Sequence, residues 1–132
     1  MDDLKKLQLI FQTLSDYNRL GMIRFICEKE RSVGEIVKVT KLSQPLVSHH
    51  LRVLKENGIL ETKRNGPFIY YYIRDKKILD AIDLFLELFK NSSLKDKAGS
   101  KFCSGWIMWF QKLNIGGPCN VNQRKIHERN DG

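Results

Sequence analysis

The stretch SVGEIVKVTKLSQPLVSHHLRVLKENGIL, residues 32–60, carries the local signals that decide the fold. Ser32 and Glu35 have the spacing of a capping box, in which each side chain satisfies an amide hydrogen at the start of a helix. This spacing predicts a short helix over about residues 33–39. The turn that follows, at residues 41–42, is too short for anything but a tight connection between two helices.

A second helix is predicted directly after that turn. Ser43 is placed to cap it, and Pro45 is tolerated in its first turn because the amide hydrogens there have no helical partner. Gly58 ends the helix as a carboxy-terminal cap. The two helices and their turn have the form of a helix-turn-helix unit.

The second helix has two different faces. At helical spacing, one apolar face consists of Val47, Leu51 and Leu54, with His50 at its edge. The outward face carries Gln44, Ser48, His49 and Arg52. These side chains form hydrogen bonds with base edges or phosphates in a DNA major groove, so this helix is predicted to be a recognition helix.

A β-hairpin is predicted after the recognition helix. Strands over residues 59–64 and 68–73 are joined by Asn65-Gly66, a strong hairpin-turn signal. Lys55 and the basic pair Lys63 and Arg64 suit contacts with phosphates or the minor groove, which add salt-dependent affinity with little sequence information.

The charge of the chain is concentrated on this segment. The 132 residues carry a net charge of +8. Between Lys41 and Arg74 there are six basic and two acidic side chains, so +4 of that charge lies on the predicted DNA-binding segment. A basic segment of this kind favours a polyanionic partner.

Three more helices complete the predicted fold. They cover residues 3–14, about 15–30 with Ser15 as the cap, and about 76–90. The first has an apolar stripe of Leu4, Leu7, Phe11 and Leu14, and the second buries Leu20, Ile23, Ile26 and Cys27. The fold class is mainly α with a small β-hairpin, a winged helix-turn-helix of about five helices plus a two-stranded wing. Residues 1–91 form this domain, and residues 92–132 form a carboxy-terminal tail, partly packed and frayed at its end.

The apolar composition of the last predicted helix indicates a homodimer. From Ile78 to Phe89 only Asp80, Asp83 and Glu87 are polar, so an apolar surface covers most of its circumference. Such a helix must be covered on two sides. A second copy of the chain, with the first helix contributing, is the economical cover. The alternative is that the tail, with its Trp106 to Phe110 run, covers the second side within one chain.

These segments resemble a known family. LSDYNRLGMIRFI (residues 14–26), the stretch quoted above and ETKRNGPFIYYYI (residues 61–73) are similar to the ArsR-type winged-helix repressors of bacteria and archaea. The resemblance covers about residues 5–90. It implies a dimer formed through the first and last helices, which blocks a promoter until a metal ion, metalloid or other signal lowers its affinity for DNA.

Two metal sites that the family often carries are missing here. Ser32 and Gly34 stand where a Cys-x-Cys would hold arsenic, lead or cadmium. On the last helix, Asp80 is present, but Ile82 stands where a zinc-binding histidine belongs.

The remaining sensor candidates are cysteines. Cys103 and Cys119 lie in the tail and, with or without Cys27, offer thiolates for trivalent arsenic or another thiophilic metal, or for a redox disulfide. Their spacing matches no metal template, so incidental cysteines are the alternative. Cys27 itself lies on an apolar helix face, where a small buried side chain is the common role.

The sequence argues against several other classes of protein. No secretory signal or membrane-length apolar segment occurs, and three irregularly spaced cysteines fit thiols in a reducing cytoplasm. No phosphate loop, nucleophile elbow or acid-base constellation indicates an enzyme. The predicted function is a cytoplasmic, dimeric repressor that binds double-stranded DNA and is released by a signal. The alternatives are a winged helix that binds protein and a DNA-binding regulator that needs no ligand.

Overall fold

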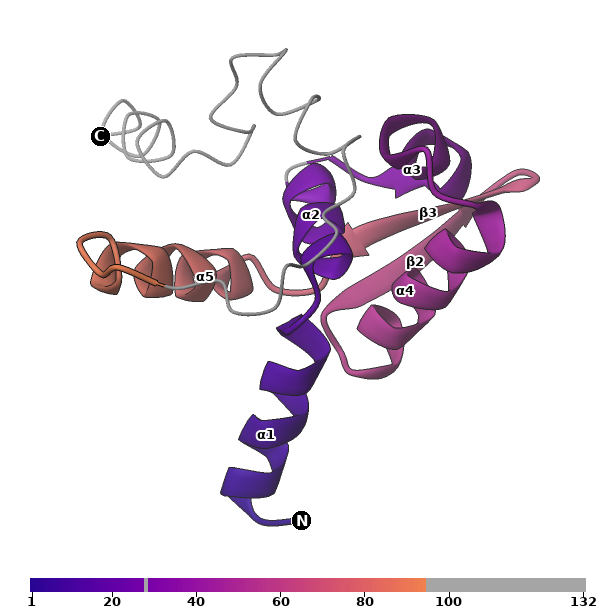
Figure 1. Ribbon diagram of the computed structural model, residues 1–132. Helices are drawn as coiled ribbons and strands as arrows, with labels where there is room; N and C mark the ends of the chain where they lie inside the picture. The colour runs from indigo at the N-terminus through magenta and orange to yellow at the C-terminus, as the bar shows by residue number, and fades with distance from the viewer. Residues whose placement is uncertain (28, 95–132) are drawn as a thin grey trace, which may run out of the picture.

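The computed structural model describes residues 1–27 and 29–94, which form five α-helices and a three-stranded sheet (Figure 1). The elements in chain order are α1 (Asp3–Leu14), α2 (Tyr17–Ile26), β1 (Arg31–Ser32), α3 (Val33–Thr40), α4 (Gln44–Glu56), β2 (Leu60–Asn65), β3 (Phe68–Ile73) and α5 (Lys77–Leu88). This is a winged helix-turn-helix, as predicted.

The helix-turn-helix unit is built by the predicted caps. Ser32 Oγ accepts a hydrogen bond from the amide of Glu35 at 3.2 Å, and the Glu35 carboxylate accepts one from the amide of Ser32 at 3.4 Å. Lys41 ends α3 in the left-handed conformation, with a φ of 57°. Ser43 Oγ then accepts from the amide of Leu46 and begins α4. The local prediction is therefore confirmed.

The sheet has one strand more than predicted. Arg31 and Ser32 form β1, which pairs antiparallel with Tyr71 and Tyr70 of β3 and gives the strand order β1-β3-β2. This pairing requires an extended chain before α3. Helix α2 accordingly ends at Ile26, earlier than the predicted end near residue 30.

Two further details of the prediction need correction. Asp16, and not Ser15, caps α2, since its carboxylate accepts the amide hydrogen of Arg19. The hairpin turn consists of Gly66 and Pro67, because Asn65 is still paired with Phe68 at the end of the strands. Gly66 has a φ of 61°, a conformation that a side chain would strain.

One core joins the helix-turn-helix unit to the sheet. The stripe of Val47, Leu51 and Leu54 on α4 is completely buried, as predicted. It packs with side chains of α2, α3 and the sheet, among them Met22, Ile23, Ile26, Ile36, Leu60 and Ile73. Leu20, predicted to be inward, is instead partly exposed.

Helices α1 and α5 project from this body and keep much of their apolar surface exposed (Figure 1). The rings of Phe11 on α1 and Phe85 on α5 meet edge to face, with centroids 5.8 Å apart. The exposed apolar side chains of the two helices are Leu4, Leu7, Ile10, Phe11, Leu84, Phe85, Leu86 and Leu88, followed by Phe89. Within residues 1–27 and 29–94, nothing covers this surface.

No helix in the described part of the chain has the length and apolar character needed to cross a membrane. The predicted tail from residue 92 onward, with Cys103, Cys119 and the Trp106 to Phe110 run, lies outside the described residues except for its first three positions.

Leu51→Ala and Leu46→Ala form a matched pair that tests the core. Leu51 is completely buried, whereas Leu46, on the same helix, is 39% exposed. Leu51→Ala should lower the free energy of unfolding by about 2–5 kcal/mol because it leaves a cavity in a packed core. Leu46→Ala should cost less than about 1 kcal/mol. Urea unfolding at one fixed protein concentration measures both values, and equal losses would contradict the assigned orientation of α4.

Candidate DNA-binding interface

The outer face of α4 presents hydrogen-bonding side chains to solvent. Because Val47, Leu51 and Leu54 fix the inner face of the helix in the core, the opposite side must point outward. The structure leaves the predicted α4 site residues exposed: Gln44, Ser48, His49, Arg52 and Lys55. These five side chains form one surface on a helix that is capped and packed, so their relative positions are fixed by the fold.

Leu46 belongs to the same exposed region and is not among the predicted site residues. Its side chain is exposed near the start of α4. The signal was present in the sequence, because Leu46 precedes the buried stripe and falls outside its helical spacing. An exposed leucine beside polar groove-facing residues suits an apolar contact, such as one with a thymine methyl group.

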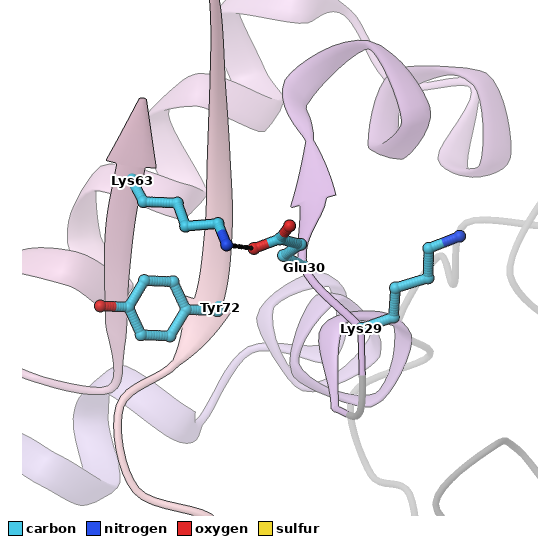
Figure 2. A pocket seen from close by; sticks show the side chains of 4 residues that line it. All are labelled: Lys29, Glu30, Lys63 and Tyr72. Carbon is cyan, nitrogen blue, oxygen red and sulfur yellow. Dashed lines mark ion pairs between the residues drawn. The ribbon is translucent and has the colours of Figure 1, made fainter. Parts of the chain in front are cut away.

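The two basic residues of the wing lie in different environments. Arg64 is exposed near the hairpin turn. Lys63 instead extends over the sheet to Glu30, which precedes β1, and its Nζ lies 2.6 Å from the Glu30 carboxylate (Figure 2). The hydrogen bond and the opposite charge of Glu30 raise the pKa of Lys63. The charge of Lys63 is therefore already paired within the fold.

Lys63 is part of a polar surface on this side of the sheet. Lys29, Glu30, Lys63 and Tyr72 line a shallow, open hollow (Figure 2). The Tyr72 hydroxyl donates to the Glu61 carboxylate at 2.8 Å, which raises the pKa of Tyr72. Arg74 Nε lies 3.5 Å from the same carboxylate. Acidic groups thus accompany the basic ones here, and the surface is not a simple phosphate site.

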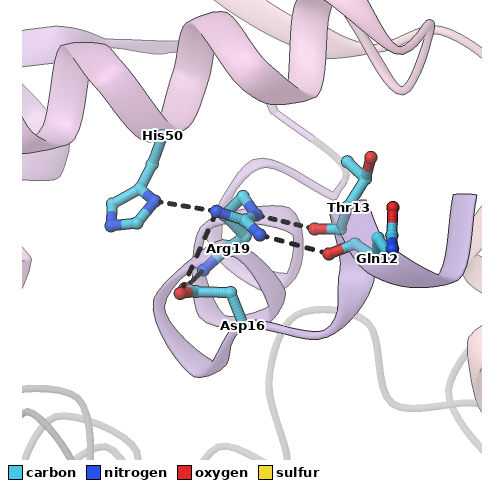
Figure 3. A network of polar contacts seen from close by, with 5 residues as sticks. All are labelled: Gln12, Thr13, Asp16, Arg19 and His50. Atoms are coloured by element: carbon cyan, nitrogen blue, oxygen red, sulfur yellow. Dashed lines mark hydrogen bonds and ion pairs between the residues drawn. The ribbon is translucent and has the colours of Figure 1, made fainter. Parts of the chain in front are cut away.

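The two adjacent histidines of α4 lie in different environments, as the sequence predicted. His49 is exposed on the outer face, whereas His50 is only 6% exposed. His50 Nδ1 lies 3.4 Å from Nη1 of Arg19 on α2 (Figure 3). Burial lowers the pKa of His50, and the charges of Arg19 and His49 act in the same direction, while Asp16 opposes them. The environment of His50 accordingly favours the neutral form of its ring.

The cysteine positions are only partly described. Cys27 is 2% exposed in the core, as predicted. Cys103 and Cys119 lie outside the described residues. Within residues 1–27 and 29–94, no three histidine, cysteine or acidic side chains come together as a metal site.

A capped recognition helix, a tight turn and a hairpin wing, with a polar and basic outer face, define a winged-helix DNA-binding protein. Comparisons with known proteins agree with this class. The profile described as "Bacterial regulatory protein, arsR family" matches residues 16–62. An uncharacterized HTH-type transcriptional regulator of Methanocaldococcus jannaschii is 34% identical over 89 residues, which make up 67% of this chain and 100% of the relative.

Two other similarities extend the comparison. The cadmium resistance transcriptional regulatory protein CadC of Listeria innocua is 36% identical over 75 residues, which cover 56% of this chain and 63% of that protein. The crystal structure of the transcriptional repressor BigR from Xylella fastidiosa matches with a TM-score of 0.55 and 30% identity, covering 70% of this chain and 91% of that chain. The chain belongs to the arsR family and is a DNA-binding transcriptional regulator.

Proposed function

We propose that the protein is a dimeric repressor that binds operator DNA through α4 and the wing and is released by a thiol-directed signal. The observation that carries the DNA-binding part is the outer face of α4, where Gln44, Ser48, His49, Arg52 and Lys55 are exposed over a buried stripe. Repression is supported by relatives that are named as repressors. The function is one of binding, with no catalytic role, and it is exercised in the cytoplasm.

Different residues of the interface contact the bases and the phosphates. Arg52 has a planar guanidinium that can bond two acceptors on a guanine, and Gln44 and His49 offer further donors and acceptors. Lys55 and Arg64 contact phosphates, which position the protein without specifying sequence. Lys63 can contact a phosphate only if its ion pair with Glu30 is broken and the phosphate takes the place of the Glu30 carboxylate.

The homodimer is supported by the apolar faces of α1 and α5. These faces carry many exposed apolar side chains, and the rings of Phe11 and Phe85 bring the two helices into contact. An exposed cluster of apolar side chains marks an association site. A two-fold axis would bring identical faces together and place two copies of α4 on one side of the dimer.

Arg52→Ala should abolish specific operator binding while the dimer stays folded, because a bidentate contact to a base contributes about 1–3 kcal/mol of discrimination. Fluorescence anisotropy with operator and scrambled duplexes measures this specificity, and circular dichroism checks the fold. Lys77→Ala is the control, since Lys77 is exposed at the start of α5, away from the recognition helix. Retained specificity in Arg52→Ala would refute the assignment of this face.

The same assay tests the class of partner. Affinity should fall steeply as salt rises, because each neutralised phosphate releases a counterion. A flat salt response would favour a winged helix that binds protein.

Leu84→Glu with Leu88→Glu should convert the dimer to a monomer. Both side chains are exposed on α5, Leu88 by 66%, and two carboxylates cannot be buried there without partners. Sedimentation velocity measures the association state. Phe68→Glu is the matched control, because Phe68 is a similarly exposed apolar residue on the wing, away from α1 and α5. A double variant that remains dimeric at the wild-type concentration would contradict this interface.

The releasing signal is assigned to the cysteines. Cys103 and Cys119, outside the described residues, would bind trivalent arsenic or another thiophilic metal, or undergo oxidation.

Cys103→Ser with Cys119→Ser should leave operator affinity unchanged and remove the response to arsenite and to oxidant, because serine oxygens neither bind arsenic as thiolates do nor form disulfides. Release of the operator is followed by anisotropy during titration with each reagent. The wild-type protein treated with a reducing agent is the control. A variant that is still released by both reagents would exclude these cysteines as the sensor.

A further inference from the structure

Arg19 lies where three helices meet. Its Nε donates to the carbonyl oxygen of Thr13 at 2.6 Å, and its Nη2 to that of Gln12 at 3.3 Å, both in the last turn of α1 (Figure 3). Its Nη1 faces His50 Nδ1 of α4 at 3.4 Å. One guanidinium therefore holds the carboxy-terminal end of α1 and the middle of the recognition helix.

The guanidinium is fixed in this position. The Arg19 side chain is only 15% exposed, and Asp16, the cap of α2, lies 3.9 Å from Nη1. The last carbonyl groups of a helix lack intrahelical partners and carry partial negative charge, so a cationic side chain is favoured there. The planar fork of an arginine can bond to several acceptors at once, which a lysine cannot reproduce.

The contact with α4 also fixes the protonation state of His50. Arginine has only hydrogen-bond donors, so the Nδ1 atom facing it must be an unprotonated acceptor, with the ring proton on Nε2. A proton on Nδ1 would place two donors and two positive charges against each other. The contact is therefore compatible with neutral His50 only.

We propose that Arg19, acting through neutral His50, is a positioning residue that sets how the recognition helix is held relative to α1. The inference rests on the proposed function, in which α1 belongs to the dimer interface and α4 contacts DNA. In a dimer, this orientation determines the separation of the two recognition helices and hence the half-site spacing that the protein accepts.

Acid should release this restraint. Burial and the neighbouring charges of Arg19 and His49 lower the pKa of His50, while Asp16 on α2 opposes them; the α1 groups at this junction are uncharged carbonyls. Because the folded-state pKa is lowered, the stability that neutral His50 contributes is present above its ordinary pKa of about 6.5 and is lost as the pH falls through the lowered value. The effect therefore lies below about pH 6.5.

The test measures affinity for operators whose half-sites are moved apart or together by one or two base pairs. The spacing preference is the ratio of the affinity for the best-spaced operator to the affinity for the altered ones. Arg19→Lys and His50→Leu should each lower this ratio by about tenfold, the size expected for losing a hydrogen bond to a charged donor. Affinity for scrambled DNA should stay within about twofold, because the phosphate-contacting side chains remain. Arg24→Lys is the matched control, since Arg24 is on the same helix but pairs with Asp83 of α5. Circular dichroism and sedimentation check fold and dimer in each variant.

A second experiment measures the spacing preference of the wild type at several pH values, so it does not depend on a variant that could fail to fold. As the pH is lowered from about 7.5 through and below the lowered pKa of His50, the wild-type spacing preference should flatten as His50 becomes protonated. His50→Asn offers an acceptor near the position of Nδ1 but does not titrate, so its preference should be constant. His49 is present in both proteins, so its contribution cancels in the comparison.

The outcomes separate the two proposals. The positioning role would be overturned if Arg19→Lys and His50→Leu fold, form dimers and keep the wild-type spacing preference. It would also be overturned if the wild type and His50→Asn respond to pH in the same way. If Arg19→Lys and His50→Leu do not fold, the pH arm decides alone. Absence of salt-dependent DNA binding or of a dimer in the wild type would instead overturn the proposed function.

Discussion

The burial of one face of α4 is the constraint on which the rest of the structure depends. Val47, Leu51 and Leu54 are completely buried between α2, α3 and the sheet. Full burial of a leucine contributes about 1.5–3 kcal/mol, so rotation of the helix about its axis would cost most of the stability of a small domain. The outward direction of Arg52 and its neighbours follows from this packing and requires no further interaction.

The domain uses its apolar residues in two separate places. One set forms the core beneath the recognition helix, and the other covers the exposed sides of α1 and α5. A short chain with a small core gains stability when a second copy covers such a surface. In the proposed function, association and DNA binding are located on different helices, and Arg19 contacts both α1 and α4.

Charge counted along the sequence overstates the charge that is available to DNA. The segment from Lys41 to Arg74 has a net charge of +4. In the fold, Lys63 is paired with Glu30, and Arg74 lies beside Glu61. Lys41, Arg52, Lys55 and Arg64 remain exposed, so the positive charge lies at the end of α3, on the outer side of α4 and near the hairpin turn.

The sequence by itself determined the helix-turn-helix unit, the hairpin and the exposed face of α4, because caps, helical stripes and turn signals act between residues a few positions apart. Only the tertiary structure decided the short strand β1, the pairing of Lys63 with Glu30 and the contact of Arg19 with His50. Each of these joins residues more than thirty positions apart in the chain. No local spacing encodes such contacts, because they exist only once the core has brought the elements together.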